Sequence, residues 1–322
     1  MSRVVKVAAG VVILAVTVAA AWRGLVAFFT EPERVAHRKI GAAYAAREFQ
    51  AVGTLPAELK ESSGIVVSRT QPGVLWSHND SGDGPSLYAI NQSGRLLATV
   101  RIDQAAAIDW EDLASGPCPR RPPSSRCLYI ADTGNNSRAR RAFTVYVVAE
   151  PLLASPGDRG STPTAESFRF RYPEGSHDSE AIAVHPEGDI TIVTKGQSGT
   201  IDFYGVDAAA VERAIGSREA IVVDRLGSSG IKPDGRIGRL ATGAAISPDG
   251  TTLAVRTYNE VFFYAAAKDD HGRRTWRDLQ RPCFLGDVEP QGEAIDYLDD
   301  ETLLLTSESR LISNGRITRV RC

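Results

Sequence analysis

The first sign of chemistry in this 322-residue sequence is a glutamate that recurs at one place in a repeated phrase. It stands just before or within a short apolar run, as in SEAIAVH and GEAIDYL. Related phrases carry a small residue at the same place. The five equivalent positions are Ser63, Glu111, Glu180, Gly243 and Glu293, with Thr242 beside the fourth. If the five segments surround one axis, we expect these positions to converge on it.

Converging carboxylates repel one another unless a positive charge lies between them. Calcium suits such a place because it takes about six to eight oxygen ligands in loose geometry, whereas magnesium demands a stricter octahedron. The pattern therefore predicts a calcium site formed by Ser63, Glu111, Glu180 and Glu293, with backbone carbonyls and water completing the shell. The alternative is structural: the glutamates would cap backbone amides between segments or bridge to neighbouring arginines and lysines.

A second set of polar residues follows the next apolar run of each segment. The set comprises His78, Asp80, Asp132, Lys195, Arg256 and Glu308, with His177 nearby. Lys195 and Arg256 have the charge to hold a phosphate or carboxylate. Asp80 or Asp132 has the chemistry of a general base, with a histidine close by. Salt bridges between segments are the alternative interpretation of the whole set.

The motifs NDSGDG and ADTGNN occupy equivalent loops in the first two segments. Asp-Ser-Gly and Asp-Thr-Gly also occur as the paired motifs of aspartic proteases, but adjacent segments of a repeat would not supply two symmetric lobes. Turn chemistry of Asp and Asn beside Gly explains both motifs. Nucleophilic Ser-His-Asp catalysis has no nucleophile-elbow motif to support it.

The elements that must position these residues follow from the repeat. Each segment has an apolar strand, a tight turn, a second strand, a loop and a third strand with an aromatic residue, for example SEAIAVH, ITIVTKG and IDFYGV. Fourth strands are expected at RLLATVRI, ESFRFRY, AIVVDRL and RPCFLG. Repeated units of four antiparallel strands are typical of a β-propeller. The predicted fold class is therefore all-β.

The number of blades follows from the spacing of the repeat. The equivalent positions lie 48, 69, 63 and 50 residues apart, and a blade needs about 40 to 50 residues. We predict five blades; a degenerate sixth is the alternative, for which few residues remain. The last segment can supply only three strands. We expect EFQAVGTLP, from the N-terminal side, to provide the fourth and to remove the exposed strand edge.

The first thirty residues differ from the rest of the chain. Arg3 and Lys6 precede a long apolar run, which indicates a signal peptide or an N-terminal transmembrane helix. We predict an anchor or signal over 1–30, a helical stalk or packing helix over 31–48, and the propeller over 49–322. The propeller would then lie outside the cytoplasm, either held at the cell membrane by a single span or secreted.

Four cysteines support export. An even number of cysteines in an exported chain indicates disulfides. Cys118 and Cys127 flank a proline-rich loop that a disulfide would fix, and Cys283 and Cys322 would tie the closing blade to its neighbour. A zinc site is the alternative, but no CxxC pair is present.

The formal net charge of −2 gives no basic field for nucleic acid, and the composition is that of a globular protein. The phrases LKESSGIVVSRTQPGVLWSHNDSGDGPSLYAI, IDWEDLASGP and LYIADTGNN resemble a group of exported bacterial β-propeller proteins, over roughly residues 55–320. This resemblance implies the fold and export. The acidic residues at the starts of inner strands are also similar to those of calcium-dependent apyrases. That likeness implies a five-bladed propeller with a calcium ion in its channel.

Two classes of function follow. The first is an envelope module that holds calcium and binds a partner protein, a glycan or a small polar ligand. The second is a calcium-dependent hydrolase of phosphate or other ester substrates, in which the metal would neutralise developing charge and position a water molecule.

Overall fold

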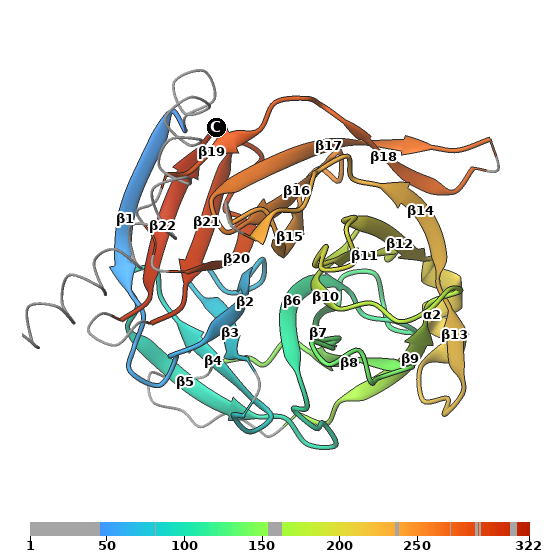
Figure 1. Ribbon diagram of the computed structural model, residues 1–322. Coiled ribbons are helices and arrows are strands. Elements are labelled where there is room, and N and C mark those ends of the chain that lie inside the picture. Colours follow the sequence, from blue (N-terminus) through green and yellow to red (C-terminus); the bar gives the residue numbers. More distant parts are fainter. Residues whose placement is uncertain are drawn as a thin grey trace, which may run out of the picture.

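The computed structural model describes residues 46–80, 82–153, 163–235, 238–270, 272–286, 289, 291–309 and 314–322. Five β-sheets are arranged around a central channel, so the chain is a five-bladed β-propeller (Figure 1). The only described helix is the short α2 (Ala208–Ala214). The predicted fold class and blade number are confirmed.

The five blades follow the chain in order. Blade 1 contains β2 (Ser62–Val67), β3 (Leu75–Asn79), β4 (Ser86–Ile90) and β5 (Leu96–Arg101). Blade 2 contains β6 (Trp110–Pro117), β7 (Arg126–Asp132), β8 (Phe143–Ala149) and β9 (Glu166–Arg171). Blade 3 contains β10 (Ser179–Val184), β11 (Ile190–Thr194), β12 (Asp202–Val206) and β14 (Asp224–Ser228). Blade 4 contains β15 (Ala241–Ile246), β16 (Thr252–Thr257), β17 (Glu260–Lys268) and β18 (Arg274–Asp278). Blade 5 contains β20 (Gly292–Tyr297), β21 (Thr302–Ser307), β22 (Arg316–Arg321) and β1 (Glu48–Thr54).

The repeated phrase is the innermost strand of each blade. The strands β2, β6, β10, β15 and β20 line the channel, and each packs against the innermost strand of the next blade. Nearly all of their residues are buried, because both faces of an inner strand meet neighbouring blades. Burial on both faces explains why these strands lack a clear polar and apolar alternation.

Blade 5 joins the two ends of the propeller. The strand β1 pairs antiparallel with β22 through residues such as Phe49 and Val320, so the N-terminal side supplies the fourth strand as expected. In Figure 1 this blue strand lies at the outer edge of the red blade. The strand β1 therefore covers the edge of β22 that the last segment would otherwise leave unpaired.

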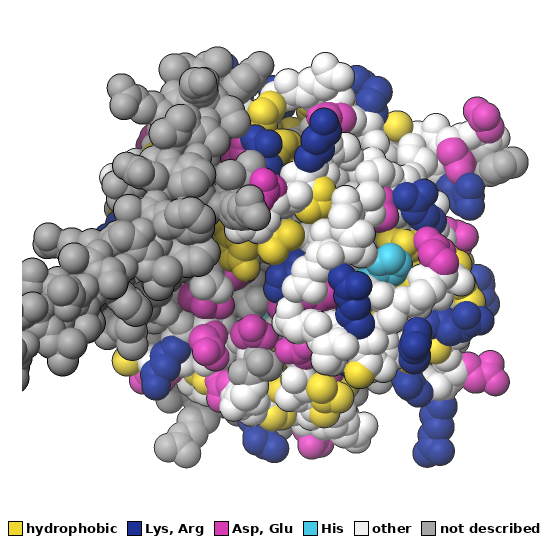
Figure 2. All heavy atoms as spheres, in the orientation of Figure 1, with side chains coloured by type: hydrophobic (Ala, Val, Ile, Leu, Met, Phe, Trp, Pro, Cys, Tyr) yellow, Lys and Arg dark blue, Asp and Glu magenta, His cyan; other side chains and the backbone are white. Residues whose placement is uncertain are grey.

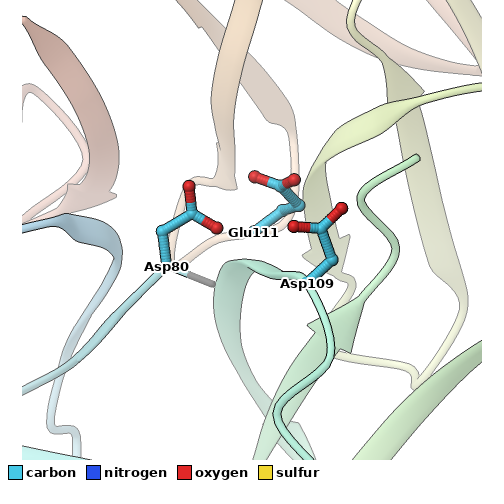
Figure 3. A group of neighbouring side chains, drawn as sticks. All are labelled: Asp80, Asp109 and Glu111. Carbon is cyan, nitrogen blue, oxygen red and sulfur yellow. The ribbon is translucent and has the colours of Figure 1, made fainter. Parts of the chain in front are cut away.

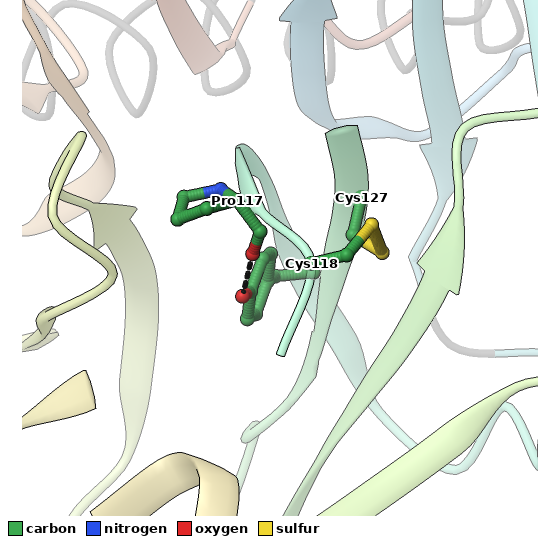
Figure 4. The surroundings of a disulfide bond; sticks show 4 residues. Pro117, Cys118 and Cys127 are labelled. Carbon is green, nitrogen blue, oxygen red and sulfur yellow. Dashed lines mark hydrogen bonds between the residues drawn. A yellow bond between two sulfur atoms is a disulfide. The ribbon is translucent and has the colours of Figure 1, made fainter. Parts of the chain in front are cut away.

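Both predicted disulfides form. Cys283 belongs to β19 (Cys283–Phe284), which pairs with β17, and it is bonded to Cys322 just after β22. This bond connects blade 4 to the closing blade. Cys118 and Cys127 close the loop between β6 and β7 (Figure 4). Beside this bond, the Tyr129 hydroxyl donates to the carbonyl oxygen of Pro117 at 2.5 Å.

Two outer strands differ from expectation. AIVVDRL does not form one strand: β13 (Ala220–Val222) pairs in parallel with β9 of blade 2, and β14 completes blade 3. RPCFLG supplies only β19, because the segment RTWRD forms the fourth strand β18 of blade 4. Outer strands face solvent on one side, so their patterns are less constrained by packing than those of the inner strands.

The predicted anchor over 1–30 lies outside the described residues, as does most of the predicted helical stalk. The described chain starts at residue 46, and β1 begins at Glu48. Among the described residues, no helix has the length and hydropathy needed to cross a bilayer. On the face seen in Figure 2, acidic and basic side chains are interspersed among the described residues.

Candidate metal centre at the mouth of the channel

Each innermost strand has an irregular register at its second residue. In every blade the pairing with the neighbouring strand skips this position. A β-bulge leaves one residue unpaired and redirects its side chain. The five bulged residues are Ser63, Glu111, Glu180, Thr242 and Glu293. The fourth equivalent position is therefore Thr242 rather than its neighbour Gly243.

The two bulged hydroxyl groups connect consecutive blades. The Ser63 hydroxyl donates to the carbonyl oxygen of Glu111 at 2.5 Å, from blade 1 to blade 2. The Thr242 hydroxyl donates in the same way to the carbonyl oxygen of Glu293 at 3.0 Å, from blade 4 to blade 5. These bonds orient the backbone that carries the two glutamates. The Ser63 hydroxyl therefore contacts the backbone that carries Glu111 and positions this residue indirectly.

Carboxylates converge where blades 1, 2 and 3 meet at the channel. Oxygen atoms of Asp80, Asp109 and Glu111 all lie within 4.8 Å of one another (Figure 3). A second triad, formed by Glu111, Asp178 and Glu180, meets the same limit. Glu111 belongs to both. We call these five residues the acidic mouth.

Equivalent backbone positions supply the members of the acidic mouth. Asp109 and Asp178 each precede a bulged glutamate by two residues, in the sequences Asp-Trp-Glu and Asp-Ser-Glu. Residues two apart in an extended chain project to the same side. Asp80 follows β3, and its amide donates to the carbonyl oxygen of Glu61 at 2.9 Å. The amide of Lys195 donates in the same way to Asp178, also at 2.9 Å, so Asp80 and Lys195 occupy equivalent places.

Blade 2 has a glycine at this place, and the glycine makes room for the carboxylates. The amide of Gly134 donates to the carbonyl oxygen of Asp109 at 3.2 Å. A Cβ atom on Gly134 would lie 2.1 Å from Oε1 of Glu111 and 2.4 Å from the Asp109 carboxylate. No side chain fits there without moving both acids.

Lys195 is the cation that reaches into the second triad. Its Nζ lies 2.6 Å from Oε1 of Glu180 and 4.0 Å from Oδ2 of Asp178. Oδ1 of Asp178 accepts a hydrogen bond from the amide of Asn135 at 2.6 Å. Oδ2 is buried and has no hydrogen-bond partner. One oxygen on the Lys195 side of the acidic mouth is therefore available as a ligand.

Burial is the main cause of the raised pKa values of the carboxyl groups in the acidic mouth. It raises the pKa of Glu111 well above its usual range, and the nearby charge of Glu180 adds to this. Burial raises the pKa of Glu180 to about 7, although Lys195 opposes the shift. Burial also raises the pKa of Asp109 to about 6, with a further contribution from Asp80. Burial would lower the pKa of Lys195, but Glu180 outweighs it and the pKa is raised.

Glu293 lies close to this charge but outside both triads. Its carboxylate accepts a hydrogen bond from the Gln291 side chain at 2.7 Å. Burial, and then the charge of Glu180, raise its pKa well above the usual range. Glu308 contributes to the same shift, and its amide donates to the carbonyl oxygen of Gln291 at 2.9 Å. Of the residues predicted to bind metal, Glu111 and Glu180 contribute carboxylates to the triads.

Two residues of the second predicted set lie between blades. His78 is buried edge-on against Trp110 of blade 2, with 5.6 Å between ring centroids. Arg256 is completely buried and donates to the carbonyl oxygens of Ala294 and Thr306, at 2.6 and 2.9 Å. It also forms an ion pair with Glu289. Both residues lie within second strands, whereas Asp80 and Lys195 follow the ends of theirs.

The remaining residues of that set have partners in blades 2 and 3. Asp132 is buried and forms an ion pair with Arg140 at 2.8 Å. The ring of His177 contacts Tyr172 and Tyr204, and its Nε2 lies 3.2 Å from the Tyr204 hydroxyl. The structure therefore brings Asp80 and Lys195 to the acidic mouth. Asp132 lies behind it and accepts from the amide of Asp109 at 3.2 Å, whereas His177 has other partners.

Asp112, which the sequence analysis did not single out, links the inner strands of neighbouring blades through its side chain. It follows the bulged Glu111 and is fully buried. Its Oδ2 accepts from the amide of Ile182 in blade 3 at 2.9 Å and from that of Ala244 in blade 4 at 3.4 Å. Burial raises its pKa well above the usual range, although these amides oppose the shift. Asp112 thus ties three inner strands together.

Asp109, Asp178 and Gly134 were also missed by the sequence analysis. A repeated signal could have found the two aspartates, because Asp-x-Glu precedes the inner strands of blades 2 and 3. The role of Gly134 depends on contacts between the two acids and the loop after β7, which no local pattern records.

The residues of the acidic mouth fit a hard divalent cation. All five supply carboxylate oxygens, which calcium prefers over nitrogen or sulfur ligands. The glycine at position 134 leaves space beside Asp109 and Glu111, which both belong to the first triad. Asp80, Asp109 and Glu111 would hold the ion in the triad that Lys195 does not enter.

Comparison with known proteins gives distant structural likenesses. No protein-family model and no curated protein sequence matches the chain. A PQQ-bound aldose sugar dehydrogenase from Streptomyces coelicolor is 10% identical with a TM-score of 0.49, over 86% of this chain and 99% of that one. A luciferin-regenerating enzyme is 11% identical with a TM-score of 0.45, over 85% and 95%. A calcium-binding protein, regucalcin from Agrobacterium tumefaciens, is 12% identical with a TM-score of 0.41, over 86% and 93%. These likenesses are too distant to decide the chemistry of this chain.

Proposed function

We propose that this propeller is an envelope binding module that holds a calcium ion at its acidic mouth and presents that face to a polar ligand or partner. The observation that carries the proposal is the convergence of Asp80, Asp109 and Glu111 at the end of the channel. Three carboxylates supply about three to six oxygens, depending on whether each binds through one oxygen or two, and calcium takes about six to eight, so water or a ligand would complete the shell. When bound, calcium would neutralise the acids and offer a site for an anionic or hydroxyl-bearing group.

The location follows from the disulfides and the N-terminal sequence. Two disulfides are typical of a protein that folds in an oxidising compartment. We propose that the apolar segment over 1–30 directs the chain to the membrane, where it is retained by a single span or removed on secretion. A partner protein, a glycan or a small polar molecule of the cell envelope is the expected ligand.

The hydrolase alternative has less support from the arrangement of the cations. It relied on Lys195 and Arg256 acting together on a phosphate or another ester. Lys195 instead pairs with Glu180, and Arg256 is buried against blade 5. Saturable, calcium-dependent turnover of an ester by the purified protein would reverse this ranking.

Calorimetric titration with calcium tests the proposal. We expect one ion to bind the purified full-length protein, and Glu111→Gln to weaken binding at least about tenfold, since each tenfold corresponds to about 1.4 kcal/mol. Glu166→Gln is the matched control, because this exposed glutamate lies on the outer strand β9. Calcium binding that Glu111→Gln leaves unchanged would place the ion elsewhere, and no binding would make the acidic mouth structural.

A further inference from the structure

The two triads of the acidic mouth differ in one respect: the Lys195 ammonium reaches into one of them. Both contain Glu111, so they are adjacent and share one carboxylate. The side chain of Lys195 reaches the triad of Glu111, Asp178 and Glu180. We infer that the Lys195 ammonium is a resident cation that occupies a second metal position and restricts the acidic mouth to one divalent ion.

The Lys195 ammonium contacts one carboxylate of its triad directly and lies within 4.0 Å of a second. Its Nζ is 2.6 Å from Glu180 and 4.0 Å from Asp178. Asp178 keeps one buried oxygen without a hydrogen bond, at the longer of these two distances. A lysine has three donors but one fixed stem, so it cannot contact every carboxylate equally. A metal ion would bind Oδ2 of Asp178, to which the Lys195 ammonium makes no hydrogen bond.

Charge explains why a built-in cation is needed. If all five residues of the acidic mouth were ionised, they would carry five negative charges within a few side-chain lengths. A single calcium ion leaves most of that repulsion in place, and buried like charges disfavour ionisation. The permanent positive charge of Lys195 stabilises the second triad without a second metal. Glu111, which also belongs to the first triad, is then shared between Glu180 and the proposed ion.

This inference deepens the proposed function and rests on it for the first ion. It predicts that removal of the Lys195 charge opens the second position. In Lys195→Met the side chain stays unbranched and apolar up to the ε position but loses the ammonium. The Glu111, Asp178 and Glu180 carboxylates then have no resident partner cation, and a divalent ion should take its place. Glu111 would bridge the two ions.

Manganese is the probe, because it accepts oxygen ligands and has an electron paramagnetic resonance signal. Equilibrium dialysis should give one manganese ion per wild-type protein and two per Lys195→Met protein. The spectrum should change from that of an isolated ion to that of a spin-coupled pair. Lys195→Arg, which retains the charge, and Lys232→Met, which removes an exposed lysine, should each still bind one ion.

Loss of the buried positive charge can weaken folding, so metal content is read together with thermal melting. Lys195→Met should melt at a lower temperature than wild type in chelator and recover in manganese. The double variant Lys195→Met/Glu180→Gln removes the proposed second position and should return to one ion without spin coupling. This variant distinguishes a second site from general loosening of the mouth.

The outcomes separate the two proposals. No ion in wild type and one in Lys195→Met would reject the proposed function at the first triad but support Lys195 as a resident cation. One ion in both proteins, two in wild type, or none in either would overturn the inference about Lys195.

Discussion

Gly134 lies against Glu111 so closely that a Cβ atom at position 134 would be 2.1 Å from Oε1 of the glutamate. The loop after β7 and the bulge of β6 therefore meet at the acidic mouth without a side chain between them. The backbone of blade 2 sets the positions of two carboxylates, Glu111 and Asp109, through this contact.

Gly134→Ala should disturb both the metal site and the fold. The added methyl group forces the Glu111 and Asp109 carboxylates to move, and such overpacking costs about 1–3 kcal/mol of unfolding free energy. We expect calcium affinity to fall by at least about tenfold, equivalent to about 1.4 kcal/mol, in a calorimetric titration. Gly84→Ala is the control, since a Cβ there has no neighbour within 4 Å. Equal affinity in both variants would show that Gly134 does not shape the site.

Calcium binding should strengthen as the pH rises from about 5 to about 7.5. Burial raises the pKa of Asp109 to about 6 and that of Glu111 well above its usual range, so protons occupy these two proposed ligands at low pH. Each ion that binds must displace them, and one pKa unit corresponds to about 1.4 kcal/mol. Titrations in two buffers of different ionisation enthalpy would measure the released protons. Binding without proton release over this range would contradict the raised pKa values.

The same shifts set the stability of the metal-free protein. Carboxyls titrate near pH 4 in an unfolded chain. Because their folded pKa values are higher, their contribution to the free energy of unfolding is fully present below about pH 4 and is lost as the pH rises through about 6 to 7. Calcium should offset this loss. The rise in melting temperature caused by calcium should therefore be small at about pH 5 and larger at about pH 8, as measured by thermal melting with calcium and with chelator.

The disulfide between Cys283 and Cys322 should contribute more stability than the other one. It spans 39 residues and connects blade 4 to blade 5, whereas Cys118–Cys127 spans 9 residues inside blade 2. Loop entropy alone gives about 4 kcal/mol for the longer loop and about 2.5 kcal/mol for the shorter. Guanidinium unfolding of the two double Cys→Ser variants measures both. A larger loss from the Cys118–Cys127 variant would mean that the seam between blades 4 and 5 does not limit stability.

Asp112 should stabilise the ring of inner strands. Asp112→Ala leaves the amides of Leu113, Ile182 and Ala244 without this acceptor. Each buried amide that is left unpaired costs about 1–3 kcal/mol, so we expect a loss of at least about 2 kcal/mol on denaturant unfolding. Asp224→Ala is the control, because its side chain is exposed and its ion pair with Arg273 spans 3.7 Å. Similar unfolding curves for the two variants would exclude a bracing role for Asp112.

The blade architecture could be predicted because buried strands and tight turns repeat in the sequence. The inner strands β10 and β20 begin at the first residues of SEAIAVH and GEAIDYL, since short apolar runs between turns permit little else. The N-terminal strand of blade 5 was predictable because the last segment lacks a fourth strand. The outer strands of blades 3 and 4 were predicted at the wrong residues, because β13 pairs with β9 of blade 2 and β19 shares the edge of β17 with β18.

The candidate site was only partly predictable, for a physical reason. Alternation along a strand places residues on faces, but a bulge shifts that alternation by one residue. The bulges leave Glu111 and Glu180 unpaired at the mouth, whereas His78 and Arg256 lie within second strands and pack between blades. The sequence analysis placed Arg256 beside Lys195, although Arg256 precedes the end of β16 and Lys195 follows the end of β11.

A crystal of the full-length protein grown with manganese tests the central claim most directly. Anomalous scattering locates the ion without assumptions about ligands. The account predicts one anomalous peak among Asp80, Asp109 and Glu111, with Lys195 still on Glu180. A protein that binds manganese only outside the acidic mouth, or shows no peak there at millimolar metal and neutral pH, would contradict it.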